Sequence, residues 1–552
     1  MKHTVRRRIL CGLVDAVLIF GVYWFQLPSL YIADPALWTF VFTALVIVFV
    51  VGMAPRILGS LREFAPSPLL RKKGKSAEPE ETGRHLSRFT KGMVGAMIAL
   101  VALAIIGYLT GLTIFNANRY KDLITTTPGD FTADVAELSM DQIPVVDRDT
   151  AIQLGKRKLG EMSDLVSQFE IAETYTQINL HGRPVRVTPL AYADIIKWFT
   201  NKEEGIPAYI QLDMVTQETS LVRLEQGMTI SPSEPFFHNL ERYARFRYPT
   251  KMFDTASFEV DENGTPYWIL STIQYRIGLW GGKDIDGAIL INAVTGDHQY
   301  YPVDQIPSWV DRVYDANLII EQLDYNGQFQ SGFWNAHFGQ KGVLRTTTGY
   351  NYIAVGDDVY LYTGMTSVTG DQSNVGFVLV NMRTKETKFY AIPGAEEYSA
   401  MRSAEGQVQN LKYTATFPLL LNVADRPTYF LSLKDGAGLV KMYAFVNVES
   451  YNVVGTGDTV AAARSDYIKK IGAADTAEIT AVIQEISSAV VDGDTQYYFR
   501  LEGQEAVYVA SIDVSPLLPF CKVGDTITLS YGGGDDALRE VTELQTVQTG
   551  GA

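Results

Sequence analysis

The sequence has few of the residues on which metal proteins and thiol enzymes depend. Its 552 residues include only two cysteines, Cys11 and Cys521, and six histidines. The cysteines do not form a C-x-x-C or other zinc-like spacing, so a disulfide framework and structural zinc are both poorly supported. No two histidines lie four residues apart, and H-E-x-x-H is absent. We therefore predict no metal site and no cofactor.

Motifs for nucleophilic catalysis are also missing from the sequence. There is no G-x-S-x-G, and Cys521 is the only thiol outside the apolar N-terminal region. Paired acids occur at 357–358 and 396–397, but acids that open a strand or helix are usually solvated or complement the helix dipole. If the protein is an enzyme, the least implausible catalytic residues are Glu397, Asp358 and His337. The sequence favours a protein that is not an enzyme.

Acidic residues are scarce in the first part of the chain, and basic residues are outnumbered in the rest. The first 92 residues contain 13 Lys and Arg but six acids, whereas the remainder contains 34 Lys and Arg and 56 acids. A basic head and an acidic body indicate two different environments. Because contact with phosphates needs a cationic surface, the acidic body argues against nucleic-acid binding.

Three long apolar runs dominate the N-terminal part, at residues 9–27, 37–53 and 93–115. A helix needs about 20 residues to cross the hydrocarbon core, so each run predicts a membrane span. Lys and Arg gather at the N-terminus and in the loop at 54–92, which the positive-inside rule assigns to the cytoplasm. We therefore predict a multi-pass cell-membrane protein in which everything after Phe115 is extracytoplasmic.

The spans contain three notable residues. Asp15 is costly inside a bilayer, and we expect it near the interface or facing another helix or water. Gly107 and Gly111 form G-x-x-x-G, which predicts packing against the first two spans or self-association into a homo-oligomer. The "RRRIL" sequence could also open a twin-arginine export signal, but Asp15 and the two further spans argue against it.

One phrase recurs along the outer part of the chain. The copies are "YIQLDMVTQETSLV", "ILINAVTGDHQYY", "FVLVNMRTKETKFY" and, more weakly, "YAFVNVESYNVV", and they align at Asp213, Asn292, Asn381 and Asn447. Asp and Asn side chains bond the backbone two residues on, so each phrase predicts a β-hairpin. An amphipathic helix precedes each one, within 149–162, 235–248, 308–323 and 396–411. A helix followed by an antiparallel meander that packs under it predicts an α+β unit.

This unit resembles the PepSY-type domain, whose members sit at or outside membranes and bind or inhibit partners without catalytic residues of their own. The hairpin of that domain contains a Thr-Gly pair, which only one of the four copies has, at Thr295–Gly296. The end of the chain, with "KVGDTITLSY", resembles a small OB-like barrel. The whole chain also resembles a group of three-span bacterial envelope proteins. We expect the following organisation: 1–115 three membrane helices, 116–145 a linker, 146–233, 234–305, 306–393 and 394–472 four PepSY-like units, 473–545 the barrel and 546–552 a tail.

Aromatic residues supply the candidate binding surface. Trp280, Trp309 and Trp334 lie close together in sequence with several tyrosines, and aromatic anchors dominate interfaces. Most should be core, but Trp280 stands among glycines and is expected to be exposed. Tyr350 and Tyr362 belong to stretches rich in hydroxyls and glycines that suit a binding loop.

These observations favour a non-catalytic, membrane-anchored binding or scaffold protein of the cell envelope. It would present a rod or arc of tandem units to another envelope protein or to a wall component. The alternatives are an exported hydrolase or transferase that acts on wall material, and an accessory or sensor subunit of a membrane complex.

Overall fold

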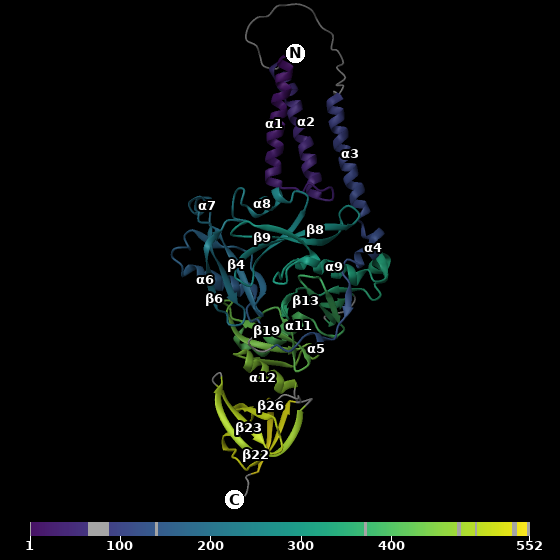
Figure 1. Ribbon diagram of the computed structural model, residues 1–552. Helices are drawn as coiled ribbons and strands as arrows, with labels where there is room; N and C mark the ends of the chain where they lie inside the picture. The colour runs from purple at the N-terminus through teal and green to yellow at the C-terminus, as the bar shows by residue number, and fades with distance from the viewer. Residues whose placement is uncertain are drawn as a thin grey trace, which may run out of the picture.

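The computed structural model describes residues 2–63, 88–138, 142–368, 373–471, 476–491, 494–532 and 538–548. Three long helices, α1 (Lys2–Gln26), α2 (Pro35–Glu63) and α3 (Arg88–Thr110), project from an α+β body (Figure 1). Each contains a stretch long and apolar enough to cross a membrane: Ile9–Gln26, Pro35–Met53 and Arg88–Thr110. The N-terminus lies at the end of these helices that is far from the body (Figure 1).

The range 93–115 predicted a single helix for the third apolar run, but the structure does not form one helix there. Helix α3 ends at Thr110, and the separate helix α4 (Thr113–Lys121) follows. The Asn116 amide donates to the carbonyls of Thr110 and Leu112, both at 3.0 Å. The Tyr120 hydroxyl donates to the carbonyl of Gly111 at 2.6 Å. These polar groups satisfy the carbonyls at the helix end, so α3 stops where it reaches the body.

Four antiparallel sheets follow in order along the described chain. The first contains β2 (Phe169–Ile171), β3 (Thr176–Leu180), β4 (Arg183–Tyr192), β5 (Ile206–Asp213) and β6 (Thr219–Met228). The second contains β7 (Met252–Val260), β8 (Pro266–Ile277), β9 (Gly281–Asn292) and β10 (His298–Pro302). The third contains β11 (Leu344–Thr346), β12 (Asn351–Val355), β13 (Asp358–Ser367), β14 (Ser373–Asn381), β15 (Thr387–Tyr390) and β16 (Gly394–Ala395). The fourth contains β17 (Thr414–Ala415), β18 (Leu419–Val423), β19 (Arg426–Lys434), β20 (Val440–Asn447) and β21 (Val454–Gly457).

A helix precedes each sheet, as the sequence predicted. These helices are α6 (Arg148–Gly160), α8 (Leu240–Arg247), α9 (Ala316–Gln328) and α11 (Glu397–Gln407), with α7 (Ile195–Asn201), α10 (Gly332–Trp334) and α12 (Val460–Ile471) as additions. Two of them begin later than predicted. The Asn239 side chain caps α8 and the Asp315 side chain caps α9, so the residues before these caps are not helical.

The stretch at 116–145, predicted to be a linker, is part of the fold. It contains α4, β1 (Thr126–Pro128) and α5 (Phe131–Asp134). Strand β1 pairs in parallel with β15 at the edge of the third sheet. Phe131 packs its ring against Phe377 and Tyr390 of that sheet. Segments about 260 residues apart in the chain are therefore neighbours in the fold.

The repeated phrase forms a hairpin in all four places, which confirms that prediction. In each of the first three, the leading Asp or Asn oxygen accepts the N–H groups two and three residues on, at 2.9 Å. The threonine three residues on then accepts another backbone N–H. The next residue has a left-handed backbone in all three: Gln217, Gly296 and Lys385. The fourth turn, at Asn447, is wider, and there the Asn447 side-chain oxygen accepts the N–H of Ser450, three residues on.

The second sheet is buried on both faces, because it lies between the first and the third. In the second sheet, Trp268 and Ile289 pack into a core shared with the first sheet. Ile269 and Leu290, one residue along, pack into a core shared with the third sheet. Successive side chains of a strand point to opposite faces, so one apolar run serves two cores.

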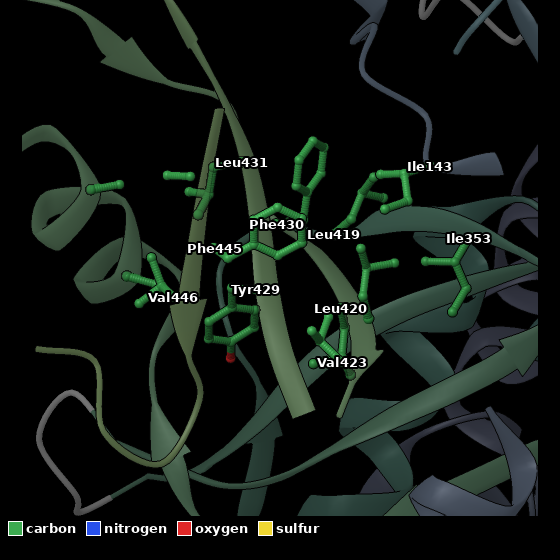
Figure 2. Close-up of a cluster of buried hydrophobic side chains, with 14 of the residues drawn as sticks. Ile143, Ile353, Leu419, Leu420, Val423, Tyr429, Phe430, Leu431, Phe445 and Val446 are labelled. Carbon is green, nitrogen blue, oxygen red and sulfur yellow. The ribbon is translucent and has the colours of Figure 1, made fainter. Parts of the chain in front are cut away.

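The four sheets close into a ring and not into the expected rod or arc. In Figure 1 the ring passes from β4 and β6 through β8 and β9 to β13 and then β19. The first and fourth units meet where the Ser432 hydroxyl donates to the carbonyl of Val145 at 2.9 Å and Lys434 pairs with Asp147 at 2.5 Å. Figure 2 shows Ile143 beside the fourth-sheet core around Leu419 and Phe430, with Ile353 of the third sheet opposite. A rod would leave these apolar faces in water.

The C-terminal part is a closed five-stranded barrel. Its strands are β22 (Thr476–Val491), β23 (Asp494–Leu501), β24 (Val507–Ser511), β25 (Thr526–Gly532) and β26 (Leu538–Gln548). They pair in the order β22-β23-β24-β26-β25, and β25 returns to β22. Strands β24 and β26 are parallel, and the other pairs are antiparallel. The barrel lies at the end of the body opposite the three long helices (Figure 1).

Candidate functional site

A cleft opens at the centre of the ring, where the first strands of the four meanders approach one another. Strand β3 contacts β7 and β13, and β12 contacts β18. Two adjoining cavities of about 480 and 210 Å³ lie here and share Arg148, Tyr175, Arg312 and Asp315. We call them together the central cleft. Their walls contain residues from all four units, including Gln177, Ser257, Tyr352 and Phe430.

Arg186 is the most deeply buried charge in the cleft wall. It projects from β4, between the buried Val185 and Val187, and is 7% exposed. Among the described residues, its guanidinium donates a single hydrogen bond, to the Gln177 side-chain oxygen at 3.3 Å. Its Nε has no partner among the described atoms. Burial, with Arg312 nearby, lowers the pKa of Arg186 to about 10, so it still carries its charge at neutral pH.

Arg312 forms the opposite side of the cleft. Its guanidinium lies 4.0 Å from the centre of the Tyr352 ring and donates to the Tyr352 hydroxyl at 2.7 Å. Tyr350 meets Tyr352 edge to face at 5.6 Å, and burial raises the pKa of Tyr350 to about 12. Tyr350 is therefore a neutral hydroxyl close to a fixed cation.

The third arginine, Arg148, stands at the start of α6. The side chain of Asp147 caps this helix by accepting from the Thr150 N–H at 2.9 Å, and Lys434 neutralises Asp147. Arg148 itself donates to the carbonyl of Glu173 at 2.9 Å. Asp315, also in the wall, caps α9. Across the described residues, no carboxylate lies within ion-pair distance of Arg148, Arg186 or Arg312.

Two buried carboxyls lie beneath the cleft. Glu259 and Asp311 are at most 1% exposed. Glu259 accepts the backbone N–H groups of Asp311 and Arg312 at 2.8 and 3.1 Å, and Asp311 accepts that of Asn179 at 2.6 Å. Burial raises the pKa of Glu259 to about 7, and burial together with Glu259 raises that of Asp311. At neutral pH these groups therefore supply less negative charge than two ionised carboxylates would.

The remaining wall is apolar and aromatic. Phe417, Leu419 and Phe430 of the fourth unit face the cleft beside Thr416 and Ser432. The Tyr175 hydroxyl is buried and has no hydrogen-bond partner within the described part of the chain, and burial raises the pKa of Tyr175 to about 12. A cleft that combines guanidinium groups, aromatic rings and the Tyr175 hydroxyl can bind an anionic molecule that also has a flat or ring-shaped body.

The three weak catalytic candidates do not come together. Glu397 is fully buried, accepts the Gly364 N–H at 2.9 Å, and has its pKa raised by burial. Asp358 pairs with Arg383 at 2.7 Å. His337 is exposed and stacks on Phe333, with ring centres 4.1 Å apart. Among the residues whose positions are described, no cluster of His, Cys, Asp or Glu could hold a metal ion.

The aromatic candidates divide into three groups. Tyr350 lines the central cleft, whereas Tyr362 is 0% exposed and lies in the core. Trp309 packs against Tyr267 at 5.0 Å, partly buried between the second and third sheets. Trp334 is 65% exposed beside Phe338, away from the cleft.

Trp280 and the two glycines of α3 belong to the junction with the long helices. Trp280 lies edge-on to Trp38 of α2 at 5.5 Å and lines an apolar cavity between α2 and α3. A Cβ on Gly107 would lie 2.5 Å from Leu279, and one on Gly111 would lie 3.1 Å from the Gly281 nitrogen. The lack of side chains at Gly107 and Gly111 therefore lets the β8–β9 turn, and not the first two spans, pack closely against this face of α3. Asp15 lies midway along α1, and its Oδ1 has no described partner.

Sequence reasoning missed Arg148, Arg186 and Arg312. For Arg186 a partial signal was available, because an arginine within the β-rich run Val185-Arg186-Val187-Thr188 either faces solvent, as strand alternation favours, or lines a cavity. Arg148 and Arg312 gave no such signal. They meet Arg186 only because the ring brings α6, β4 and the segment before α9 together.

Comparisons with known proteins give no family for this chain. No family model matches, and no curated protein matches. A solved structure of a Synechocystis apocarotenoid oxygenase mutant (Glu150Asp) is similar at 9% identity and a TM-score of 0.17, covering 51% of this chain and 60% of that one. Dihydro-heme d1 dehydrogenase NirN in complex with DHE is similar at 8% identity and a TM-score of 0.13, covering 68% and 56%. This chain thus spans less than two thirds of either structure, and likeness this weak carries no argument.

Proposed function

We propose that this chain is a membrane-anchored binding protein of the bacterial cell envelope, whose central cleft holds an anionic ligand with a ring-shaped body. The observation that carries the proposal is Arg186, a buried cation that faces a cavity and has one long hydrogen bond. Isolated buried charge is costly, so a site that keeps one is usually completed by a partner. A phosphate or carboxylate would be that partner, held by bidentate guanidinium contacts.

The aromatic wall narrows the ligand class. Tyr350, Tyr352 and Phe417 offer ring faces and edges on the same cavity. A cavity of about 480 Å³ has the size typical of small-molecule sites. Phosphorylated or carboxylated sugars, which occur in wall polymers, combine an anionic group with such a body. The ligand would therefore be a short stretch of acidic glycan.

Several features support an envelope location. The Lys- and Arg-rich N-terminus and 54–92 loop favour the cytoplasmic side for that end of the helices. The body lies at the opposite end (Figure 1). We further propose that the barrel is OB-like, since its strand order and its parallel β24–β26 pair support that topology. We also propose that each helix and the meander after it is a PepSY-like unit, and that the closed ring of four sheets is propeller-like.

The test is ligand-induced stabilisation of the full-length protein in nanodiscs. Glucose 6-phosphate, oligogalacturonate and a neutral oligosaccharide are compared by thermal unfolding. A ligand at 100 times its Kd adds about 2.7 kcal/mol, so an acidic probe should raise the Tm while the neutral one does not. Arg186→Met should abolish the shift.

The matched control is Arg183→Met. Arg183 is on the same strand, but it is exposed and pairs with Asp213 outside the cleft. This variant should keep the shift of the wild type. Equal shifts with acidic and neutral probes, or a shift that survives in Arg186→Met, would refute the proposal.

A further inference from the structure

An exposed apolar surface lies beside the ends of the membrane helices. It is formed by α7 and by residues around α8, and we call it the aromatic ledge. Its exposed members are Ile195, Ile196, Phe199, Phe236, Phe237 and Phe246, each 44–67% exposed. No residue of α7 is buried, although its sequence is "IIKWFTN". Such a helix contributes little to the core of the body.

The ledge is continuous with α1. Phe237 meets Trp24, near the C-terminal end of α1, edge to face at 5.0 Å. Phe236 in turn meets Trp198 of α7 at 5.2 Å. In Figure 1, α7 and α8 lie at the end of the body where α1 and α2 meet it. The apolar surface thus extends sideways from a helix that is long and apolar enough to span a membrane.

The connection between ledge and helix is rigid. Arg245 of α8 donates to the carbonyl of Leu27 at 2.9 Å, just past the end of α1. The Arg242 guanidinium lies 4.3 Å from the Trp24 ring centre. On α7, the Asp194 side chain accepts the N–H groups of Ile196 and Lys197 and fixes the start of the helix. These contacts hold the exposed side chains at a set level relative to α1.

We propose that the aromatic ledge rests in the interfacial region of the same bilayer that α1, α2 and α3 cross, so that phospholipid covers it. Aromatic and aliphatic side chains concentrate at that depth in membrane proteins. Lys202 adds the cation expected there, because its Nζ lies 4.7 Å from the Phe199 ring centre and can reach lipid phosphates. The body is then fixed to the membrane by a second, lateral contact in addition to its spans.

The proposal is tested by photocrosslinking of the full-length protein in nanodiscs of phosphatidylcholine and phosphatidylglycerol. Benzoylphenylalanine replaces Phe199 in one variant and Phe520 in the other. Both phenylalanines are well exposed, at 64% and 72%, but Phe520 is on the C-terminal barrel, far from the long helices. We expect the yield of lipid adducts to be several-fold higher at position 199. Equal yields, or adducts at 199 only to another copy of the protein, would overturn the proposal.

A second measurement needs no substitution. Hydroxyl-radical labelling of the wild-type protein in the same nanodiscs reports the access of solvent to each phenylalanine. Lipid cover predicts weak labelling of Phe199 and Phe237 and strong labelling of Phe520. Labelling in proportion to the exposed fractions, which are similar for Phe199 and Phe520, would show that the ledge faces water and would contradict the inference.

Discussion

Two buried arginines of this chain have nearly equal exposure and opposite surroundings. Arg245, at the junction with α1, is 5% exposed, and Arg186, in the central cleft, is 7% exposed. Arg245 donates to the carbonyls of Leu27, Tyr248 and Lys251 and lies 4.1 Å from the Phe253 ring centre. Arg186 has one hydrogen bond to the Gln177 amide.

The difference shows that burial alone does not distinguish a charged side chain with a functional role from one with a structural role. Burial lowers the pKa of both arginines, so neither pKa shift separates them. What separates them is the supply of acceptors. Where carbonyl oxygens take up the N–H groups, the cation is structural, and where they do not, the cation is available to a ligand. We make three predictions from this comparison, in order of decreasing expected effect on stability.

The largest effect should come from Arg245→Met. The substitution leaves the carbonyls of Leu27, Tyr248 and Lys251 without this donor and removes one of the links between α1 and the body. Each buried acceptor left unsatisfied costs about 1–3 kcal/mol, so we expect a total loss of about 3 kcal/mol. Thermal unfolding in detergent measures it. Arg247→Met, on the same helix, is the control, because the described contacts of Arg247 are with the carbonyl and the ring of Tyr243 in its own helix. If both variants lost equal stability, the role assigned to Arg245 would be wrong.

The second prediction concerns the carboxyls beneath the cleft. The pKa of Glu259 is raised from 4.5 to about 7, so the folded protein binds its proton more tightly than the unfolded chain does. This stabilisation is complete below about pH 4.5 and is lost as the pH rises through about 7. The slope can reach about 1.4 kcal/mol per pH unit. Glu259→Gln should flatten the pH dependence of the unfolding free energy over that window.

Glu262→Gln is the control for this experiment. Glu262 follows the same strand but is exposed beside His181. Its substitution should leave the slope between pH 4.5 and 7 unchanged. A slope that persists in Glu259→Gln would show that another group carries the titration.

The smallest effect, with the opposite sign to the first, is expected for Arg186→Met without ligand. Methionine fills part of the same space and removes a poorly satisfied buried charge. We expect the unliganded protein to gain about 1 kcal/mol or to stay unchanged, because no ion pair is broken. The Tm of the variant and the wild type, measured without acidic probes, gives the answer. A loss as large as that of Arg245→Met would mean that Arg186 is structural.

The membrane junction shows a limit of local reasoning. Gly107 and Gly111 gave a signal for close packing, and close packing occurs, but the partner is the β8–β9 turn at Leu279 and Gly281. G-x-x-x-G reports only that a helix face is small. Which surface occupies that face depends on the fold of a segment about 170 residues further along the chain.

Local chemistry in the sequence determined the apolar helices and the repeated turns. The run 37–53 is apolar along its length and forms a helix without a distant partner. The turns are also local, because the Asn292 and Asn381 side chains accept backbone N–H groups two and three residues further on. The tertiary structure alone decided that the sheets close into a ring and that Arg148, Arg186 and Arg312 share one cavity. An apolar strand such as β8 has the same sequence pattern whether a helix or two other sheets cover it. Strand periodicity specifies which side chains share a face of the sheet, but not which element packs against that face.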